Sequence, residues 1–119
     1  MVVMTDRLRI ERYNNKDIIF VDYRGLKEKE MIELVMRHQK LTEETRLPFL
    51  ADFHETFATP GYMLHAKEFV KATRPLINKG ALLGIDIVKA WILKGILLTY
   101  GVNYKSFPSK EDAIEFLTE

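Results

Sequence analysis

The residue types that carry most enzyme chemistry gather at one place in this sequence, the segment that holds Asp52, His54, Glu55 and Thr56. The segment follows a short apolar run that we interpret as a buried strand. It would then lie on a loop at the carboxyl end of a parallel strand, where open α/β sheets place their sites. A histidine there can act as a base near neutral pH. Polar residues more commonly cap or hydrate such loops, so we expect no catalytic residue.

Metal, nucleotide and acyl-transfer chemistry lack their usual residues. The chain has no cysteine, and its three histidines fall on three predicted elements, so we expect no metal site. Glycine-rich phosphate loops and a Gly-x-Ser-x-Gly elbow are missing, and we expect no cofactor. His38 lies on the apolar stripe of a predicted helix, where we interpret it as a core side chain with one hydrogen bond. His65 is interpreted in the same way.

Alternating strand and helix patterns must position these residues. A period-two pattern over 7–13 and a β-branched and aromatic run over 17–23, joined by Asn14-Asn15, predict an N-terminal β-hairpin. The remaining patterns are helix 26–45, strand 47–53, helix 60–73, strand 81–85, helix 88–100, strand 104–107 and a last helix from 110. This order, β-β-α-β-α-β-α-β-α, requires parallel strands joined by crossovers after the hairpin. We therefore predict an α/β fold, a single domain over 1–119 with a mixed five-stranded sheet and four helices.

Length and composition fit one globular domain. The chain has 119 residues, of which 47% are hydrophobic and 29% charged, so it can bury a core and is not disordered. Its net charge of +1 gives no electrostatic basis for nucleic-acid binding. The longest apolar stretch, 81–102, is interrupted by Asp86, Lys89 and Lys94, so we predict no membrane span. With no cysteine and no visible signal peptide, we expect a cytoplasmic protein.

Three stretches give the chain a family resemblance. They are 22–25 (DYRG) with Glu30-Met31, 79–85 (KGALLGI) and 107–117 (FPSKEDAIEFL). Together with the element order, they resemble the STAS family, the sulphate-transporter and anti-sigma-factor-antagonist domains, and especially its small stand-alone bacterial members. The branch that the chain resembles is related in shape to the CRAL-TRIO lipid carriers. The resemblance implies a STAS-like fold and a cytoplasmic, non-enzymatic module that docks protein partners or small ligands.

The sequence departs from this family after the third predicted strand. Anti-sigma-factor antagonists carry an Asp-Ser-Ser-Gly turn there, and a partner kinase phosphorylates its second serine. Here the turn is Asp52-Phe53-His54-Glu55, which has no serine and no glycine. The nearest hydroxyls belong to Thr56 and Thr59, and Thr59 precedes Pro60 as a predicted helix N-cap. We therefore expect no phosphorylation switch at the family position.

The predicted helix 88–100 (VKAWILKGILLTY) is apolar on almost every side. A surface helix usually has one apolar stripe and a polar back, so an apolar back indicates a contact surface. The side that we expect to face the sheet carries Val88, Trp91 and Leu98. The side that we expect to be exposed carries Leu93, Ile96 and Leu97. The alternative is that neighbouring helices cover this helix completely and make it core.

Two binding functions remain open, and an enzyme that uses His54 and Glu55 is the least favoured third. The first is a regulatory module that contacts a protein partner, or a second copy as a homodimer, through helix 88–100. The second is a carrier of a lipid or other apolar molecule in a cavity between the second and third predicted helices, lined by Phe57, Tyr62, Phe69, Trp91 and Tyr100. The candidate binding residues for both are Asp52, His54, Glu55, Phe57, Tyr62, Trp91, Leu93, Ile96 and Leu97.

Overall fold

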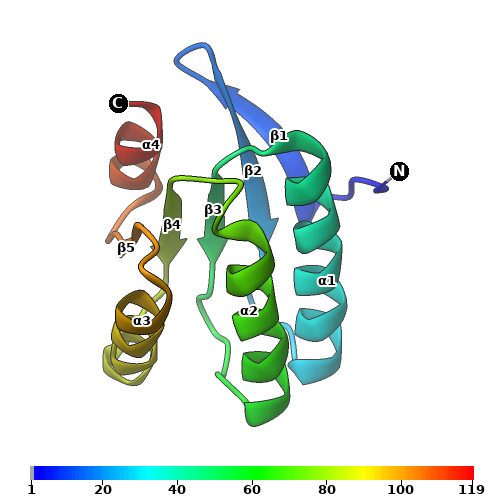
Figure 1. Cartoon of the computed structure of the whole chain (residues 1–119), viewed down its shortest axis with the longest axis vertical. Helices are drawn as coiled ribbons and strands as arrows, with labels where there is room; N and C mark the ends of the chain where they lie inside the picture. The colour runs from blue at the N-terminus through cyan, green and yellow to red at the C-terminus, as the bar shows by residue number, and fades with distance from the viewer. Residues whose placement is uncertain (1) are drawn as a thin grey trace.

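Five strands form one sheet in the order in which they occur in the chain. The computed structural model describes residues 2–119, and Figure 1 shows its arrangement. The strands are β1 (Leu8–Tyr13), β2 (Lys16–Asp22), β3 (Phe49–Asp52), β4 (Gly80–Leu83) and β5 (Tyr104–Ser106). The hairpin pair β1–β2 is antiparallel, and the pairs β2–β3, β3–β4 and β4–β5 are parallel. The predicted mixed five-stranded sheet is therefore confirmed.

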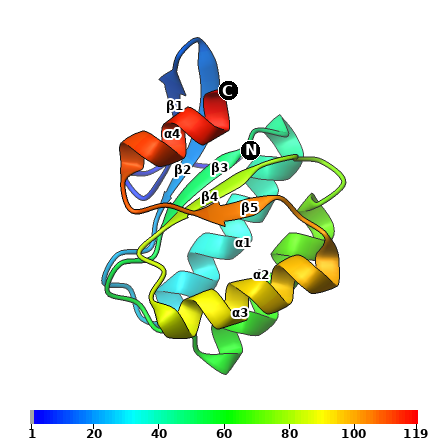
Figure 2. The same cartoon turned by 90° about the vertical axis from the view of Figure 1, so that its left-hand side faces the viewer.

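The helices lie on both faces of this sheet. They are α1 (Glu28–Thr45), α2 (Pro60–Thr73), α3 (Ile87–Tyr100) and α4 (Lys110–Thr118). Each parallel connection moves one strand further in the same direction, so right-handed crossovers place α1, α2 and α3 on the same face. Figure 2 shows this arrangement, with the sheet separating these three helices from α4. The fold is thus a three-layer α/β domain with unequal outer layers.

Two clusters of buried side chains match the two faces. The larger one lies between the sheet and the first helices, and its strand members include Ile19, Val21, Phe49 and Ala51. The smaller one lies under α4 and contains Ile18, Phe20, Leu50, Ala81, Leu83, Ala113, Phe116 and Leu117. Neighbouring residues of one strand enter different clusters because strand side chains alternate between faces. This is why the strands read as nearly continuous apolar runs.

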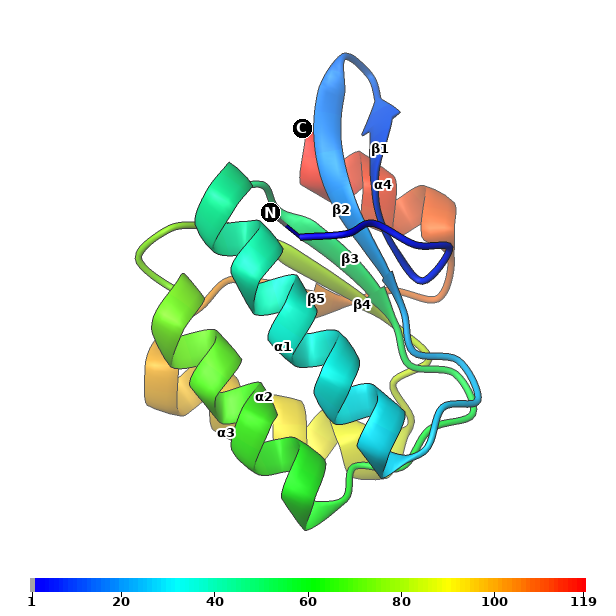
Figure 3. The ribbon, with the colours of Figure 1, turned by 90° about the vertical axis from the view of Figure 1, so that its right-hand side faces the viewer.

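α1 and α2 lie side by side over the sheet, as Figure 3 shows. The buried side of α1 is the stripe predicted from the sequence: Met31, Leu34, Val35, His38 and Leu41. α2 begins where predicted, because the Thr59 side chain accepts a hydrogen bond from the Tyr62 backbone N–H at 3.3 Å and Pro60 occupies the first turn. These two helices therefore contribute buried side chains to the larger core cluster.

α3 differs from them because none of its residues is buried. It starts at Asp86, whose carboxylate accepts a hydrogen bond from the Lys89 backbone N–H at 2.9 Å, and it ends at Gly101. In Figure 2 it runs along the open side of α2 beneath β5. Its apolar side chains thus have only one neighbouring surface on which to pack.

Four of the five observed strands are shorter than the predicted ones, and β2 has the predicted length. The predicted strand 47–53 is observed as a strand only over β3, although the Pro48 carbonyl and the Phe53 N–H each make a backbone hydrogen bond of 2.9 Å to a neighbouring strand. The predicted strand 81–85 is observed as β4. Gly84 ends β4, because it adopts a φ of +73° in the left-handed region. The apolar runs extend further than the strands because Phe53 and Ile85 contribute to the larger core cluster from loops.

Candidate functional site

A cavity lies between α2, α3 and the sheet, and we call it the α2–α3 cavity. Its volume is about 110 Å³. It is lined from α1, β3, α2, β4, α3 and β5 and from the loops after β3 and β4. Nearly all its lining side chains are apolar or aromatic. The lining reaches the surface at Phe57, which is 83% exposed, so the cavity is open to solvent there.

Aromatic rings bound the cavity at both ends of the strands. Near the carboxyl ends, Tyr23 stacks on Phe53 with ring centroids 4.6 Å apart, and Tyr62 meets Tyr23 edge-on at 5.7 Å. Near the amino ends, Phe49 meets Tyr104 edge-on at 5.1 Å. A four-residue strand spans about 13 Å between these ends. The cavity is therefore an elongated apolar space between two aromatic walls.

The amino-end wall contains two polar groups without partners. His38 packs between Phe49 and Phe69, with ring centroids 4.9 and 4.4 Å away, and is only 2% exposed. Its Nε2 has no hydrogen-bond partner, nor has the Tyr104 hydroxyl. Tyr104 lies near Thr73, whose hydroxyl donates to the Phe69 carbonyl at 2.7 Å. The one hydrogen bond expected for His38 is therefore not made by its Nε2 atom.

Burial determines the protonation of these groups. Removal from water lowers the pKa of His38 to about 3, so its imidazole is neutral at pH 7. Burial also raises the pKa of Tyr104 to about 12, so its hydroxyl keeps its proton. The amino-end wall therefore offers neutral hydrogen-bonding groups and no charge.

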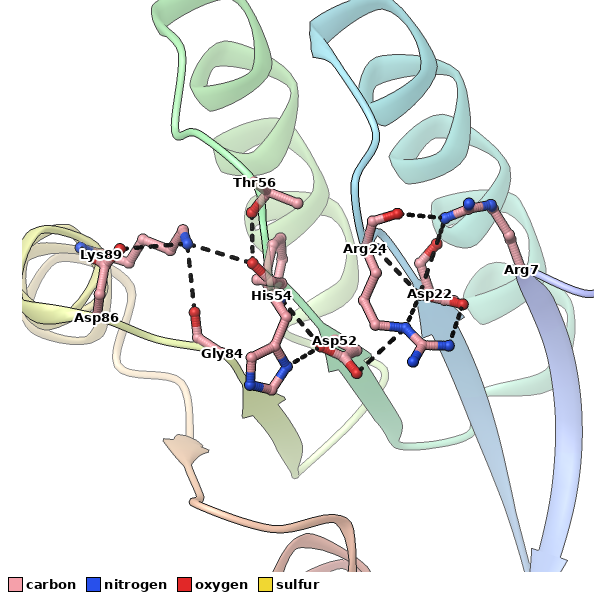
Figure 4. A network of polar contacts seen from close by, with 10 residues as sticks. Arg7, Asp22, Arg24, Asp52, His54, Thr56, Gly84, Asp86 and Lys89 are labelled. Carbon is pink, nitrogen blue, oxygen red and sulfur yellow. Dashed lines mark hydrogen bonds and ion pairs between the residues drawn. The ribbon is translucent and has the colours of Figure 1, made fainter.

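The charged residue in the lining is Lys89, at the carboxyl end of the cavity. Its ammonium group donates to the carbonyls of Phe53 and Gly84 at 3.3 and 3.4 Å and lies 3.5 Å from an Asp86 carboxylate oxygen. Figure 4 shows the side chain bridging the loops after β3 and β4. Because protein acceptors already occupy its hydrogens, Lys89 ties α3 to the two loops.

The cluster singled out from the sequence lies beside the cavity, at the carboxyl ends of β2 and β3. The buried Asp52 carboxylate accepts a hydrogen bond from the His54 backbone N–H at 3.0 Å and lies 2.6 Å from His54 Nδ1. Figure 4 shows the imidazole next to this carboxylate. The pairing orients the ring as a carboxylate orients a catalytic histidine. However, the nearest hydroxyl in sequence, on Thr56, is buried and donates to the Phe53 carbonyl at 2.7 Å.

A second acidic group joins this network from β2. The guanidinium of Arg24 binds both carboxylate oxygens of Asp22 at 2.9 Å and lies 3.7 Å from Asp52. Hydrogen bonds from Arg24 hold the pKa of Asp22 below its ordinary value. Arg7 donates to the backbone carbonyls of Asp22 and Arg24 at 3.2 and 2.9 Å. The charged groups of this network thus have partners within it, so the network stabilises the loops.

A close backbone contact fixes the loops after β3 and β4 relative to each other. A Cβ atom added at Gly84 would lie only 2.4 Å from the His54 backbone nitrogen. Glu55 beside it adopts a φ of +59°, in the left-handed region. The Asp-Phe-His-Glu turn therefore depends on a glycine in the other loop, at a position that only the three-dimensional structure reveals.

The structure brings together only part of the predicted binding set. The α2–α3 cavity is lined by Phe57, Tyr62, Leu93 and Ile96, and also by Phe69. The polar network contains Asp52 and His54, while Glu55 lies on its exposed turn. Trp91, Leu97 and Tyr100 do not line the cavity. The cavity predicted between the second and third helices is present, with a partly different lining.

The predicted orientation of α3 is wrong. Val88, Trp91 and Leu98, expected to face the sheet, are all exposed, Trp91 to 69%. Leu93, Ile96 and Leu97, expected at the outer surface, pack against the larger core cluster. The physical reason is that α3 is apolar on almost every side. Hydrophobic periodicity identifies the buried face of a helix only where polar residues mark the opposite face. The orientation is instead determined by its attachments, the Asp86 cap and the Lys89 bridge.

Several lining residues were missed by the sequence analysis. They are spread over the whole chain, with examples at Met31, Phe49, Met63, Ala66, Ile85, Ile92 and Tyr104. A histidine on the apolar stripe of α1 is the one available signal, and its position there is equally typical of an ordinary core residue. Residues that are apolar in sequence look alike whether they face a filled core or a cavity, so no pattern could separate them.

Comparisons with known proteins agree on the fold. No protein-family model matches the chain, and no curated protein sequence does. A crystal structure of an uncharacterised protein of the DUF3478 family with a SpoIIAA-like fold, from Shewanella loihica, superposes with a TM-score of 0.70 and 17% identity. The match covers 92% of this chain and 91% of that chain. An anti-sigma-factor antagonist (STAS) domain protein from Planctomyces limnophilus superposes with a TM-score of 0.62 and 13% identity, over 94% of this chain and 98% of that chain.

Both matches extend over nearly the whole length of the chain described here. Their sequence identities are low, so the likeness concerns the fold. Within residues 2–119, no helix is long and apolar enough to cross a bilayer. The hairpin, the three parallel crossovers and the helix on the opposite face therefore make a SpoIIAA-like fold, as in STAS domains.

Proposed function

We propose that this chain is a non-enzymatic binding module that holds an apolar small molecule in the α2–α3 cavity. The observation that carries this proposal is an open, almost wholly apolar cavity at the site where the sheet meets its least buried helix. Ligand sites are typically concave and mostly apolar, with few polar groups. The STAS-like fold supports a binding or regulatory role. The absence of cysteine supports a cytoplasmic location.

α3 makes this cavity accessible. Its inner residues Ile92, Leu93 and Ile96 line the cavity but are only half-buried. The cost of moving a helix outward scales with the apolar area it exposes, so α3 can shift more cheaply than α1 or α2. A ligand larger than the present 110 Å³ can therefore enter by displacing α3 slightly and extending past Phe57.

The proposal can be tested with N-phenyl-1-naphthylamine, a neutral probe whose fluorescence rises in apolar surroundings. We expect saturable binding with one probe per chain. Ala66→Phe puts a ring into the cavity and should weaken binding at least tenfold. Ala90→Phe, which adds the same ring on the exposed side of α3, is the matched control and should leave binding unchanged. Equal binding by both variants, or no saturable binding, contradicts the proposal.

A second candidate function is contact with another copy of this chain through the outer face of α3. That face carries exposed apolar side chains: Ile87, Val88, Trp91 and Leu98. Burying such a side chain contributes roughly 1.5–3 kcal/mol. A net charge of +1 does not oppose self-association. Light scattering after size exclusion should then show a dimer that Trp91→Glu converts to a monomer; a monomer in both samples rejects this candidate.

Neither function needs phosphorylation. The family position holds no serine, and Thr59 caps α2 while the Thr56 hydroxyl is buried and bonded to a backbone carbonyl. We therefore propose that the module acts without the phosphorylation switch of anti-sigma-factor antagonists. Incubation with an anti-sigma kinase should leave the mass of the protein unchanged. Stoichiometric phosphate on Thr56 would show instead that the loop opens to a kinase.

A further inference from the structure

The two unpartnered polar groups in the amino-end wall restrict the kind of ligand that the α2–α3 cavity can take. His38 Nε2 and the Tyr104 hydroxyl belong to side chains that are only 2% and 5% exposed, and both residues line the cavity. Both rings pack on Phe49, from α1 and from β5, so the two rings lie at the same end of the cavity. A buried polar atom without a partner destabilises a fold, and such atoms are uncommon. Two of them at one end of an apolar cavity indicate a ligand group that binds there.

The chemistry of this end excludes a charged ligand group. The imidazole of His38 is neutral, and the Tyr104 hydroxyl is protonated at pH 7. Among the described lining residues, only Lys89 carries a charge. Its ammonium group lies at the carboxyl end of the cavity and is bound to backbone carbonyls. A carboxylate or an ammonium placed beside His38 would be buried without a counter-charge, which is costly. A neutral oxygen carries no such penalty.

The hydrogen-bonding capacity of the two groups matches an oxygen. A tyrosine hydroxyl can donate one hydrogen bond, and a neutral imidazole nitrogen either donates or accepts, depending on the tautomer. A hydroxyl oxygen can accept from tyrosine and donate to the imidazole, and a carbonyl oxygen can accept from both. The remainder of the ligand would lie against apolar and aromatic side chains such as Phe69 and Leu82.

We propose that the α2–α3 cavity selects apolar molecules that carry one neutral oxygen, a hydroxyl or a carbonyl, which binds His38 and Tyr104 while the apolar body lies toward Phe57. This inference rests on the proposed function and specifies its ligand class. It also assigns a role to His38 and Tyr104 as specificity-determining residues. The distance of about 13 Å along the strands accommodates two fused aromatic rings.

Three probes that differ in one substituent test this proposal: naphthalene, 2-naphthol and 2-naphthoate. Their dissociation constants are measured at pH 7 by competition with N-phenyl-1-naphthylamine. Tyr104→Phe removes only the hydroxyl, so it should weaken 2-naphthol binding about fivefold to tenfold and leave naphthalene binding unchanged. His38→Leu should have the same selective effect. 2-Naphthoate should bind more weakly than both neutral probes to the unmodified protein.

Tyr62→Phe is the matched control, because it removes a hydroxyl from the same cavity at the opposite end. Tyr62 packs edge-on against Tyr23, and its hydroxyl is not among the buried unpartnered atoms, so the ratio of the 2-naphthol and naphthalene affinities should not change. Thermal melts show whether each variant is folded. If Tyr104→Phe and His38→Leu both leave this ratio unchanged, or if 2-naphthoate binds most tightly, the ligand class is wrong although the cavity still binds apolar molecules. If none of the probes binds, the proposed function fails with it.

Discussion

α1 and α3 cross the same face of the sheet, but they contribute to it differently. α1 has a charged outer side and one apolar stripe, and that stripe is buried. α3 is more apolar in sequence, yet none of its residues is buried. Hydrophobicity alone therefore does not determine which helix becomes core, because a helix must also have neighbours on each apolar side. The comparison indicates that α1 stabilises the domain, whereas α3 covers a cavity and presents an apolar outer face.

The largest effect on the free energy of unfolding is expected when a leucine of α1, rather than one of α3, is replaced by alanine. Leu34→Ala in α1 removes a side chain that is only 4% exposed, so we expect it to lower the free energy of unfolding by about 3 kcal/mol. Urea denaturation followed by circular dichroism measures this loss. A loss below about 1 kcal/mol would mean that α1 is packed as loosely as α3.

The pH dependence of stability should identify the buried histidine of α1. His38 has a pKa of about 3 in the folded protein, against 6.5 for an exposed histidine. The unfolded chain therefore binds the proton first as the pH falls. The contribution of neutral His38 to the free energy of unfolding is complete above pH 6.5 and is lost toward pH 3. Between pH 7 and pH 5 we expect a loss of about 2 kcal/mol. His38→Leu should reduce that loss, as measured by urea denaturation at both pH values.

The attachment of α3 can be tested through two glycines with the same backbone conformation. Gly84 and Gly101 have φ values of +73° and +67°, so alanine is strained by about 1 kcal/mol at either position. Only Gly84 lies against another backbone, because nothing is within 4 Å of a Cβ atom at Gly101. Gly84→Ala should therefore cost about 1.5 kcal/mol more than Gly101→Ala. Equal losses in chemical denaturation would show that the two loops separate easily.

The smallest effect is expected on the outer face of α3. Leu98 is 79% exposed, so Leu98→Ala should change the free energy of unfolding by less than about 0.5 kcal/mol at concentrations where the protein is monomeric. Leu34→Ala is the matched substitution in α1. A loss as large as that of Leu34→Ala would place Leu98 in a core or in an interface that persists under the conditions of the measurement.

The sequence was more informative about the elements than about the site. The predicted order of strands and helices is confirmed, because Thr59 and the Asn14-Asn15 turn are local signals. The site depends instead on which apolar residues meet. Tyr62 and Phe57 were predicted in the cavity and line it, whereas Trp91 was predicted there and lies outside.

The sequence by itself determined the α/β class, the buried stripe of α1 and the loop that carries Asp52 and His54, because periodicity and capping act between residues close together in the chain. Only the tertiary structure decided the orientation of α3 and the partners of His38. Nearly uniform apolarity leaves the rotation of α3 to be set by contacts with distant loops. Whether a buried histidine finds a hydrogen-bond partner likewise depends on α1, α2 and β5 meeting around it, which no local pattern encodes.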